Sequence, residues 1–352
     1  MKQLNILLDP YIFNTQSIGG ISRYYAEVYS RLNAMSNISV ILPINNPTNV
    51  NTYIRNSNLL NFEWEQISIS SFDLFIPTYY STYFLDRINA PFVLTIYDMA
   101  HETYPDQFHP LDFTIKNKRK LVSQAARVIA ISENTKSDVV RMLGVPESSI
   151  DVIPLATDIQ FDPKLKLSLS VPEKFILYVG ARNTYKNFLF FLRGVQPLVK
   201  ESSDLSVICA GGGTFSKLEM RNIELLGLTK NIFQMNVTDG MLASLYSKTQ
   251  AFVYPSMYEG FGIPVLEAFT CGAAALLSNR SSLPEIGGDA ALYFDPEDVE
   301  SLRLKLRNVL YNKDLKMELI LKGFARAKLF SWERTAEKTI ETYRKVVQKA
   351  IH

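Results

Sequence analysis

Short apolar runs alternate with amphipathic segments along most of the chain. Runs typical of buried strands cover residues 4–8, 38–42, 73–77, 92–96, 127–131 and 151–153, and a second series covers 175–180, 205–210, 232–235, 251–254 and 273–277. Helical spacing of apolar residues lies at 21–35, 111–126, 134–143, 187–200, 215–226, 240–247 and 264–271. Such strand–helix alternation predicts parallel sheets with helices on both faces.

A polar stretch over residues 158–172 interrupts this alternation. It contains proline-bearing turns and shows no clear period, so we predict an interdomain linker. A chain of 352 residues is also long for a single hydrophobic core. We therefore predict two Rossmann-like domains, residues 1–165 and residues 173–331, with a final amphipathic helix over 332–352 that joins the first. Ligand crevices in such sheets lie at the carboxyl ends of the strands.

Charge and composition narrow the classes of function. A formal net charge of +2 gives no general field for nucleic acid, and we expect no nucleic-acid partner. Cys209 and Cys271 lie in apolar stretches, which favours a reduced compartment. The cysteines and the three histidines show no metal-ligand spacing, so we expect no metal and no other cofactor. With no signal-peptide pattern and no run of ~18 apolar residues, we expect a cytoplasmic protein that either stays in solution or contacts the inner face of the membrane.

The most informative segment is 254–268, which runs from a strand end through a glycine-bearing loop into a helix. Gly260 and Gly262 allow close backbone approach and unusual φ angles. Pro264 suits the first helical position, where no backbone N–H is needed. The N–H groups around it, backed by the helix dipole, form a predicted anion site for which a diphosphate is the natural ligand.

Two acids, Glu259 and Glu267, flank this helix start. Carboxylates bind vicinal hydroxyls well, so Glu267 is a candidate for a ribose diol and Glu259 for hydroxyls of a sugar. Each acid alone is more commonly a solvated loop residue or a helix-start acid favoured by the dipole. Arg182 and Lys186 follow the first strand of the second domain and are candidates to offset the charge of a diphosphate. The glycines, the proline, the acids and this basic loop together favour the binding site.

This segment resembles the paired-glutamate signature of the family-four retaining glycosyltransferases, which have the GT-B fold. Further parts of the resemblance, which covers nearly the whole chain, are Gly19-Gly20-Ile21, 131–136, Tyr178-Val179-Gly180, Lys186-Asn187, 210–213 and 282–286. It implies a fold of two Rossmann-like domains whose parallel sheets face each other across a central cleft. It also implies a nucleotide-sugar donor and no metal, and several relatives act on lipid-linked saccharides.

The resemblance assigns roles to matching positions. Lys186, with Arg182, would bind the donor diphosphate, and Glu267 would bind the ribose. Glu259 and the backbone of Phe261 and Gly262 would hold the donor sugar. The remaining donor contacts would come from the backbone of Ile263 and Val265 at the phosphates, the loop around Val237 at the base, and Gly19 and Gly20 from the first domain.

One departure concerns the donor-sugar histidine. Many relatives carry His-Asp after the strand that corresponds to residues 92–96, whereas this chain has Tyr97-Asp98-Met99-Ala100-His101. Either His101 or the Tyr97 hydroxyl is then expected to take over that contact. The alternative for His101 is an ordinary loop residue.

Two further segments carry alternative interpretations. The basic run 116–120 lies on a predicted helix and is most simply a solvated face, with contact to a membrane surface as the alternative. The aromatic run 79–84 lies at a strand end, where it either packs in the core or borders the acceptor.

The expected enzyme is a hexosyltransferase that adds mannose from GDP-mannose to a growing surface polysaccharide such as an O-antigen. The acceptor would be a saccharide or a lipid-linked saccharide. A UDP-hexose donor is the alternative within the same fold. A sugar-nucleotide epimerase and a non-catalytic nucleotide-sugar binding protein are the alternatives of other classes. A dehydrogenase is disfavoured because no Gly-x-Gly-x-x-Gly fingerprint is present.

Overall fold

The computed structural model describes residues 3–16, 19–43, 60–61, 72–162, 171–182 and 184–351. They form two compact units. Unit 1 comprises Met1–Ala156 and Phe330–His352, and unit 2 comprises Thr157–Leu329. The predicted linker begins just after this division, and its residues 163–170 lie outside the described part of the chain.

Unit 1 is built on parallel strands. The first sheet has the order β3-β2-β1-β4 and the second has the order β5-β6-β7, and a parallel bridge between Phe75 and Phe92 joins them. The strands are β1 (Leu4–Leu8), β2 (Ile38–Leu42), β3 (Leu60–Asn61), β4 (Leu74–Ile76), β5 (Val93–Ile96), β6 (Arg127–Ala130) and β7 (Ile150–Val152). β4 and β5 are buried throughout, as expected for strands covered on both faces.

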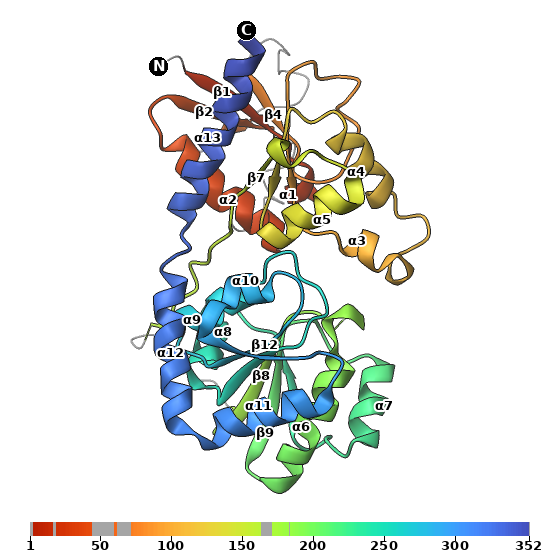
Figure 1. The fold of residues 1–352 in the computed structure, drawn as a ribbon, viewed down its shortest axis with the longest axis vertical. Helices are drawn as coiled ribbons and strands as arrows, with labels where there is room; N and C mark the ends of the chain where they lie inside the picture. The colour runs from red at the N-terminus through yellow and green to blue at the C-terminus, as the bar shows by residue number, and fades with distance from the viewer. Residues whose placement is uncertain are drawn as a thin grey trace. The chain divides into compact units, whose positions relative to one another are not determined.

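Helices cover these strands. They are α1 (Tyr11–Thr15), α2 (Gly20–Asn33), α3 (Ala100–Thr103), α4 (Thr114–Val122), α5 (Glu133–Leu143) and α13 (Trp332–Ile351), with 3-10 turns at Pro105–Gln107 and Glu147–Ser149. The N-cap of α5 is Ser132, whose side chain accepts a hydrogen bond from the Thr135 amide. The last helix, α13, drawn in blue in Figure 1, packs against α2. Tyr29 and Tyr343 connect the two helices through their hydroxyls, 3.3 Å apart.

Unit 2 holds one parallel six-stranded sheet with the order β10-β9-β8-β11-β12-β13. The strands are β8 (Lys174–Val179), β9 (Leu205–Ala210), β10 (Ile232–Met235), β11 (Ala251–Tyr254), β12 (Ala275–Ser278) and β13 (Ala291–Phe294). The helices are α6 (Phe188–Glu201), α7 (Lys217–Leu225), α8 (Asp239–Lys248), α9 (Ile263–Thr270), α10 (Leu283–Gly287), α11 (Val299–Tyr311) and α12 (Lys313–Ala327), with 3-10 turns at Thr184–Lys186 and Gly288–Ala290.

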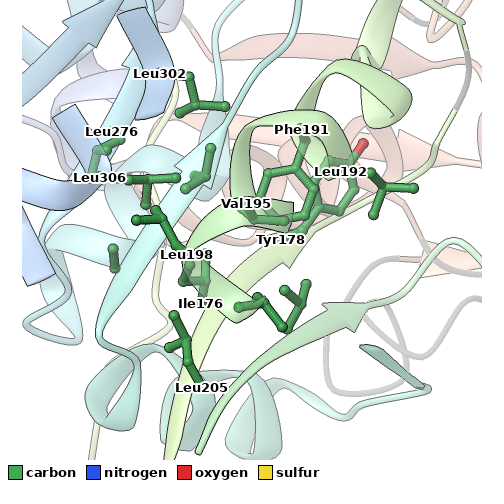
Figure 2. Close-up of a cluster of buried hydrophobic side chains, with 14 of the residues drawn as sticks. Ile176, Tyr178, Phe191, Leu192, Val195, Leu198, Leu205, Leu276, Leu302 and Leu306 are labelled. Atoms are coloured by element: carbon green, nitrogen blue, oxygen red, sulfur yellow. The ribbon is translucent and has the colours of Figure 1, made fainter. Parts of the chain in front are cut away.

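The core of unit 2 lies between the sheet and helices α6 and α11. Figure 2 shows Phe191, Val195 and Leu198 of α6 beside Leu302 and Leu306 of α11, with strand residues of the sheet in the same cluster. α6 and α11 approach closely at Gly194, where an added Cβ would lie 2.5 Å from a methyl carbon of Leu302. β13, α10, α11 and α12 were not among the predicted elements.

In each unit the strand order reverses at one place. In unit 1 the chain builds β2 and β3 on one side of β1 and then returns to place β4 on the other. In unit 2 it builds β9 and β10 on one side of β8 and then returns to place β11 on the other. Open parallel sheets bind ligands at such switch points, beyond the carboxyl ends of the two central strands. The loops that follow β1, β4, β8 and β11 are therefore expected to border the ligand sites.

Candidate functional site

The switch point of unit 2 brings together two residues predicted for the site. Lys186 ends the 3-10 turn after β8, and Glu259 lies in the loop after β11. Their Nζ and Oε1 atoms are 2.6 Å apart, although the residues are 73 positions apart in sequence. The Lys186 side chain is 17% exposed and that of Glu259 is 10% exposed. This burial excludes the interpretation of Glu259 as a solvated loop residue.

An aromatic side chain lies close to this ion pair. The Lys186 ammonium is 5.8 Å from the centre of the Tyr254 ring, at the end of β11. Burial, followed by the nearby charge of Glu259, raises the pKa of Tyr254 well above its ordinary value, so its phenol stays neutral. The Ser256 hydroxyl in the next turn is fully buried and has no hydrogen-bond partner in the described part of the chain. The strand end therefore holds a cation, an anion and neutral hydroxyls within one loop system.

Two serines hold the glycine-bearing loop in shape. The Glu259 amide donates to Ser281 Oγ at 2.8 Å, and the Ser282 hydroxyl lies 2.9 Å from the carbonyl oxygens of both Glu259 and Phe261. Gly262 has φ +101°, and an added Cβ there would lie 3.0 Å from a Leu283 methyl carbon. A side chain at this position would be strained as well as crowded. The loop is thus anchored from the α10 side.

Glu267 lies on the buried face of α9. Only 6% of its surface is exposed, and its neighbours in sequence, Leu266 and Ala268, are buried with it. One carboxylate oxygen accepts a hydrogen bond from the Tyr246 hydroxyl of α8 at 3.1 Å. Burial, and next the charge of Glu267, raises the pKa of Tyr246, which keeps the phenol a donor. A buried carboxylate held by a neutral donor is suited to accepting further hydrogen bonds from a ligand diol.

Arg182 is placed differently from Lys186, although both follow β8. Its guanidinium contacts Glu219 Oε1 at 2.6 Å and the carbonyl oxygens of Gly211, Gly213 and Thr214 at 3.0, 2.7 and 3.1 Å. The side chain is only 3% exposed. Gly211, Gly212 and Gly213 all have positive φ, so the guanidinium holds a turn that only glycine adopts easily. Arg182 therefore organises the loops after β8 and β9, and its predicted contact with a diphosphate stays a prediction.

The helix start behind the glycine loop differs in detail from the prediction. α9 begins at Ile263, so Pro264 occupies the second helical position and not the first. The Val265 amide donates to the Gly262 carbonyl at 2.9 Å, which closes the first turn. If the Val265 amide also contacts a phosphate, its N–H must be shared between that phosphate and the Gly262 carbonyl. Phe261 is buried, while Val237, in the loop after β10, is half-buried.

Unit 1 carries the remaining predicted residues. Gly19 and Gly20 lie at the start of α2, with Gly20 its first residue. His101 of α3 stacks on Phe108 with ring centres 3.7 Å apart, and its Nε2 is 3.3 Å from Asp112 Oδ2. The Tyr97 hydroxyl is buried and donates to the Thr78 carbonyl at 3.3 Å. Since that hydroxyl is enclosed in the core, the alternative that Tyr97 contacts the donor sugar is disfavoured.

The switch point of unit 1 also holds a carboxylate. Asp9, directly after β1, is fully buried and accepts hydrogen bonds from the Tyr83 hydroxyl at 2.6 Å and from the Tyr11 amide at 3.1 Å. The Thr78 amide lies 3.4 Å from its second oxygen. Burial raises the pKa of Asp9 to about 6, although these hydrogen bonds oppose the shift. The Tyr11 and Tyr79 rings stack on each other, with centres 6.2 Å apart and nearly parallel planes.

The basic run of α4 is not the uniform surface that either interpretation assumed. Lys118 is completely buried, with its Nζ 3.0 Å from Glu102 Oε2 and 2.9 Å from the Asp98 carbonyl oxygen. It also lies 4.8 Å from the centre of the Tyr80 ring. The other cations of the run, Lys116, Arg119 and Lys120, are exposed. The helix turn separates one structural lysine from three surface cations.

Sequence reasoning did not identify the residues that support the site. Ser281, Tyr246 and Glu219 hold Glu259, Glu267 and Arg182 respectively. Ser282 was part of the resemblance but had no assigned role. For Glu219 a signal was available, because Ser216 and Glu219 have the spacing of a capping box, which the structure contains.

Among the described residues, no group of three or more histidine, cysteine, aspartate or glutamate side chains is placed to hold a metal ion. No helix in the described part of the chain is both long and apolar enough to cross a bilayer.

Sequence comparison identifies the family. The family model described as Glycosyl transferases group 1 matches residues 163–326, and the one described as Glycosyltransferase Family 4 matches residues 38–161. O-antigen chain mannosyltransferase B of Escherichia coli is 30% identical over 282 residues, which cover 76% of this chain and 73% of that protein. The serotype-specific mannosyltransferase WbdA of Escherichia coli is 31% identical over 248 residues, 66% of this chain but only 30% of that longer protein.

Solved structures share the fold at low sequence identity. A sucrose-phosphate synthase from Thermosynechococcus elongatus matches with a TM-score of 0.77 and 17% identity, over 99% of this chain and 100% of that one. HepE of Anabaena in complex with UDP and glucose matches with a TM-score of 0.75 and 17% identity, over 97% and 100%. The predicted fold class, two Rossmann-like units of the GT-B type, is confirmed. The chain is a member of glycosyltransferase family 4.

Proposed function

We propose that this protein is a metal-independent, retaining mannosyltransferase that uses GDP-mannose to extend a surface polysaccharide. The observation that carries the proposal is the Lys186–Glu259 pair at the switch point between β8 and β11. It supplies a cation for a leaving diphosphate and a carboxylate for sugar hydroxyls at the edge of the sheet where such folds bind ligands. The names of the relatives, O-antigen and serotype-specific mannosyltransferases, support mannose as the transferred sugar.

Lys186 is the group we assign to the diphosphate. Its ammonium is largely buried yet keeps 17% of its side chain exposed, so an anion can approach it. Charge interactions are stronger in such a partly desolvated place than in water. The start of α9, with its dipole directed at the same loop, adds a second source of positive potential. Together they stabilise the charge that develops on the leaving group.

The two acids are assigned to the hydroxyl groups of the donor. Glu259, in the loop next to Lys186, would bind hydroxyls of the mannose ring, and Glu267, deeper on α9, would bind the ribose diol. When Lys186 turns to the diphosphate, Glu259 exchanges part of an ion pair for hydrogen bonds from the sugar. This exchange joins recognition of the sugar to recognition of the phosphate.

The proposed reaction needs no protein base. The bond from the anomeric carbon to the diphosphate oxygen breaks, and its electron pair leaves with GDP. The acceptor hydroxyl attacks the same face, and its proton passes to the departing phosphate oxygen. Lys186 and the α9 amides then have one task, to hold the leaving group and its charge.

The acceptor is assigned to the carboxyl edge of unit 1. Tyr79 and Tyr11 present stacked, partly exposed rings there, and Tyr83 is exposed with its hydroxyl on Asp9. Aromatic faces suit the apolar faces of sugar rings. The saccharide acceptor, free or lipid-linked, would lie along these rings.

A ligand screen followed by a transfer assay tests the proposal. GDP should raise the melting temperature more than UDP, ADP or dTDP, because a ligand that binds only the folded state stabilises it by mass action. GDP-mannose with mannose oligosaccharides should then yield an extended product with an α-linkage, in the presence of EDTA. Lys217→Ala, an exposed lysine of the same unit, serves as the matched control for Lys186→Ala. A β-linked product, or activity that EDTA abolishes, would reject the mechanism.

The same screen separates the alternatives. Stronger stabilisation by UDP would favour a UDP-hexose donor, which is supported by the HepE structures with UDP and with UDP-glucose. Isomerised donor without acceptor would indicate an epimerase. Donor binding without turnover towards any acceptor or water would indicate a binding protein.

A further inference from the structure

The loop before α4 and one face of that helix form an unusual surface, which we call the α4 face. It consists of Leu111, Phe113, Lys116, Arg119 and Lys120. Leu111 is 71% exposed and Phe113 is 61% exposed, although both are large apolar side chains. Figure 1 shows α4 at the periphery of unit 1.

Helical geometry places the three cations on one side of α4. Lys116, Arg119 and Lys120 are spaced by three and four positions, which brings them to one face. Phe113 precedes Lys116 by three residues and continues that face. In the described part of the chain, none of the three cations forms an ion pair. Lys118 points the other way and is neutralised in the core by Glu102.

The one acid within this segment is held away from the cations. Asp112 Oδ2 is 3.3 Å from His101 Nε2, and Oδ1 accepts the Thr114 amide at 2.8 Å. Those contacts lower the pKa of Asp112, with the Thr114 hydroxyl as the largest cause. The α4 face therefore combines exposed apolar side chains with a net positive charge.

The exposed leucines of α7 lack this combination. On α7, Leu218 and Leu225 are 68% and 75% exposed, but Arg221 and Glu224 between them carry opposite charges. We propose that the α4 face binds the surface of an anionic lipid membrane. Leu111 and Phe113 would enter the boundary between headgroups and acyl chains, and the three cations would contact lipid phosphates.

Charge complementarity decides between a membrane and other partners. A protein partner of ordinary composition would have to supply a separate acidic side chain for each of the three adjacent cations. An anionic bilayer offers a continuous negative surface together with an apolar layer just below it, and this face has both complements. Each lysine or arginine near such a surface strengthens binding by about 5-fold, so the three cations together contribute about 100-fold.

Co-sedimentation with vesicles tests the proposal. The full chain should bind vesicles of phosphatidylglycerol and phosphatidylcholine in equal parts, and should not bind pure phosphatidylcholine. Added salt should weaken the binding. Lys116→Gln, Arg119→Gln and Lys120→Gln combined should lower the partition coefficient about 100-fold. The double variant Leu111→Ser, Phe113→Ser should lower it at both low and high salt.

Controls keep each outcome decisive. The double variant Leu218→Ser, Leu225→Ser removes exposed leucines of α7 and should bind vesicles like the wild type. All variants should keep the wild-type melting temperature and the thermal shift with GDP, which separates membrane binding from the donor site. Absence of vesicle binding by the wild type, or unchanged binding by the triple variant, would overturn the proposal. Binding to RNA with no binding to vesicles would identify a nucleic acid as the partner instead.

Discussion

The two switch points of this protein each hold a largely buried carboxylate, but the partners of the two carboxylates differ. In unit 2 the carboxylate of Glu259 lies 2.6 Å from the Lys186 ammonium, and both side chains keep some exposure. In unit 1 the carboxylate of Asp9 has only neutral donors and is fully buried. Lys118 of unit 1 is instead fully buried in the core, where it pairs with Glu102 of α3.

The comparison of the lysines in the two units shows how the exposure of a charged side chain separates a structural role from a binding role. Lys118 contacts a carboxylate, a carbonyl oxygen and an aromatic ring and has no exposed surface. Lys186 has a carboxylate and aromatic neighbours too, but its side chain remains 17% exposed. Removing the first lysine should therefore affect folding, and removing the second should affect chemistry.

The largest effect is expected for Lys118→Met. It leaves Glu102, whose side chain is 5% exposed, as a buried carboxylate without its lysine. Breaking a buried pair in this way costs about 3–5 kcal/mol of unfolding free energy, which urea unfolding would measure. Adding Glu102→Gln should recover part of the loss, and Lys120→Met on the exposed side should change stability by less than about 0.5 kcal/mol. Equal losses of unfolding free energy in Lys118→Met and Lys120→Met would contradict the structural role assigned to Lys118.

Next in size is Lys186→Ala. Loss of one preorganised group at the developing charge lowers turnover about 10²- to 10³-fold, equivalent to about 2.7–4 kcal/mol. The unfolding free energy should change much less than in Lys118→Met, because the Lys186 side chain is partly exposed. Steady-state kinetics with GDP-mannose, beside urea unfolding of the same sample, measures both. A variant that keeps full turnover would remove Lys186 from the proposed site.

A smaller effect is expected at the second acid of unit 2. Glu267→Ala removes an anionic acceptor and should weaken nucleotide binding about 10- to 100-fold, while turnover at saturating donor changes less. Tyr246→Phe, which removes only the donor 3.1 Å from that carboxylate, should weaken it less than Glu267→Ala. Calorimetric titration with GDP measures both, and exposed Glu224→Ala is the control. Unchanged affinity in Glu267→Ala would contradict the ribose assignment.

The smallest effect concerns pH and unit 1. Burial raises the pKa of Asp9 to about 6, from its ordinary value of 3.8. The folded chain then holds a proton that the unfolded chain has lost, so the contribution of Asp9 to stability falls as pH rises between these two values. Asp9→Asn cannot ionise and should be more stable than the wild type at pH 7.5, by about 1 kcal/mol, since the full shift corresponds to about 3 kcal/mol and the amide loses the Thr78 contact.

Thermal unfolding of Asp9→Asn at several pH values checks this expectation. The gain should shrink towards pH 4, where Asp9 of the wild type is protonated. Exposed Asp106→Asn should show no such pH dependence. A variant that is less stable than the wild type at every pH would show that hydrogen bonding outweighs desolvation at this switch point.

Much of the architecture was predictable because it depends on local pattern. The apolar runs and the helical spacing identified most strands and helices, with ends shifted by a few residues. The later part of unit 2 was missed at β13, α10, α11 and α12. The loop and helix of the Tyr254–Ala268 segment were also predictable, because glycines, a proline and paired acids indicate a strand–loop–helix junction at short range.

The fold class, the family, and the acids and lysine at the unit 2 switch point could all be predicted from the residues alone. Those properties depend on residue types that recur at short spacing along the chain. The role of each charge, in contrast, depends on contacts between segments that are distant in sequence. The tertiary structure placed Lys186 against Glu259 across 73 residues, directed Arg182 to the glycine turn, and buried Lys118 while its neighbours stayed exposed. Desolvation of a charge and its pairing with an opposite charge depend on which distant segments pack together. A local sequence pattern does not contain that information.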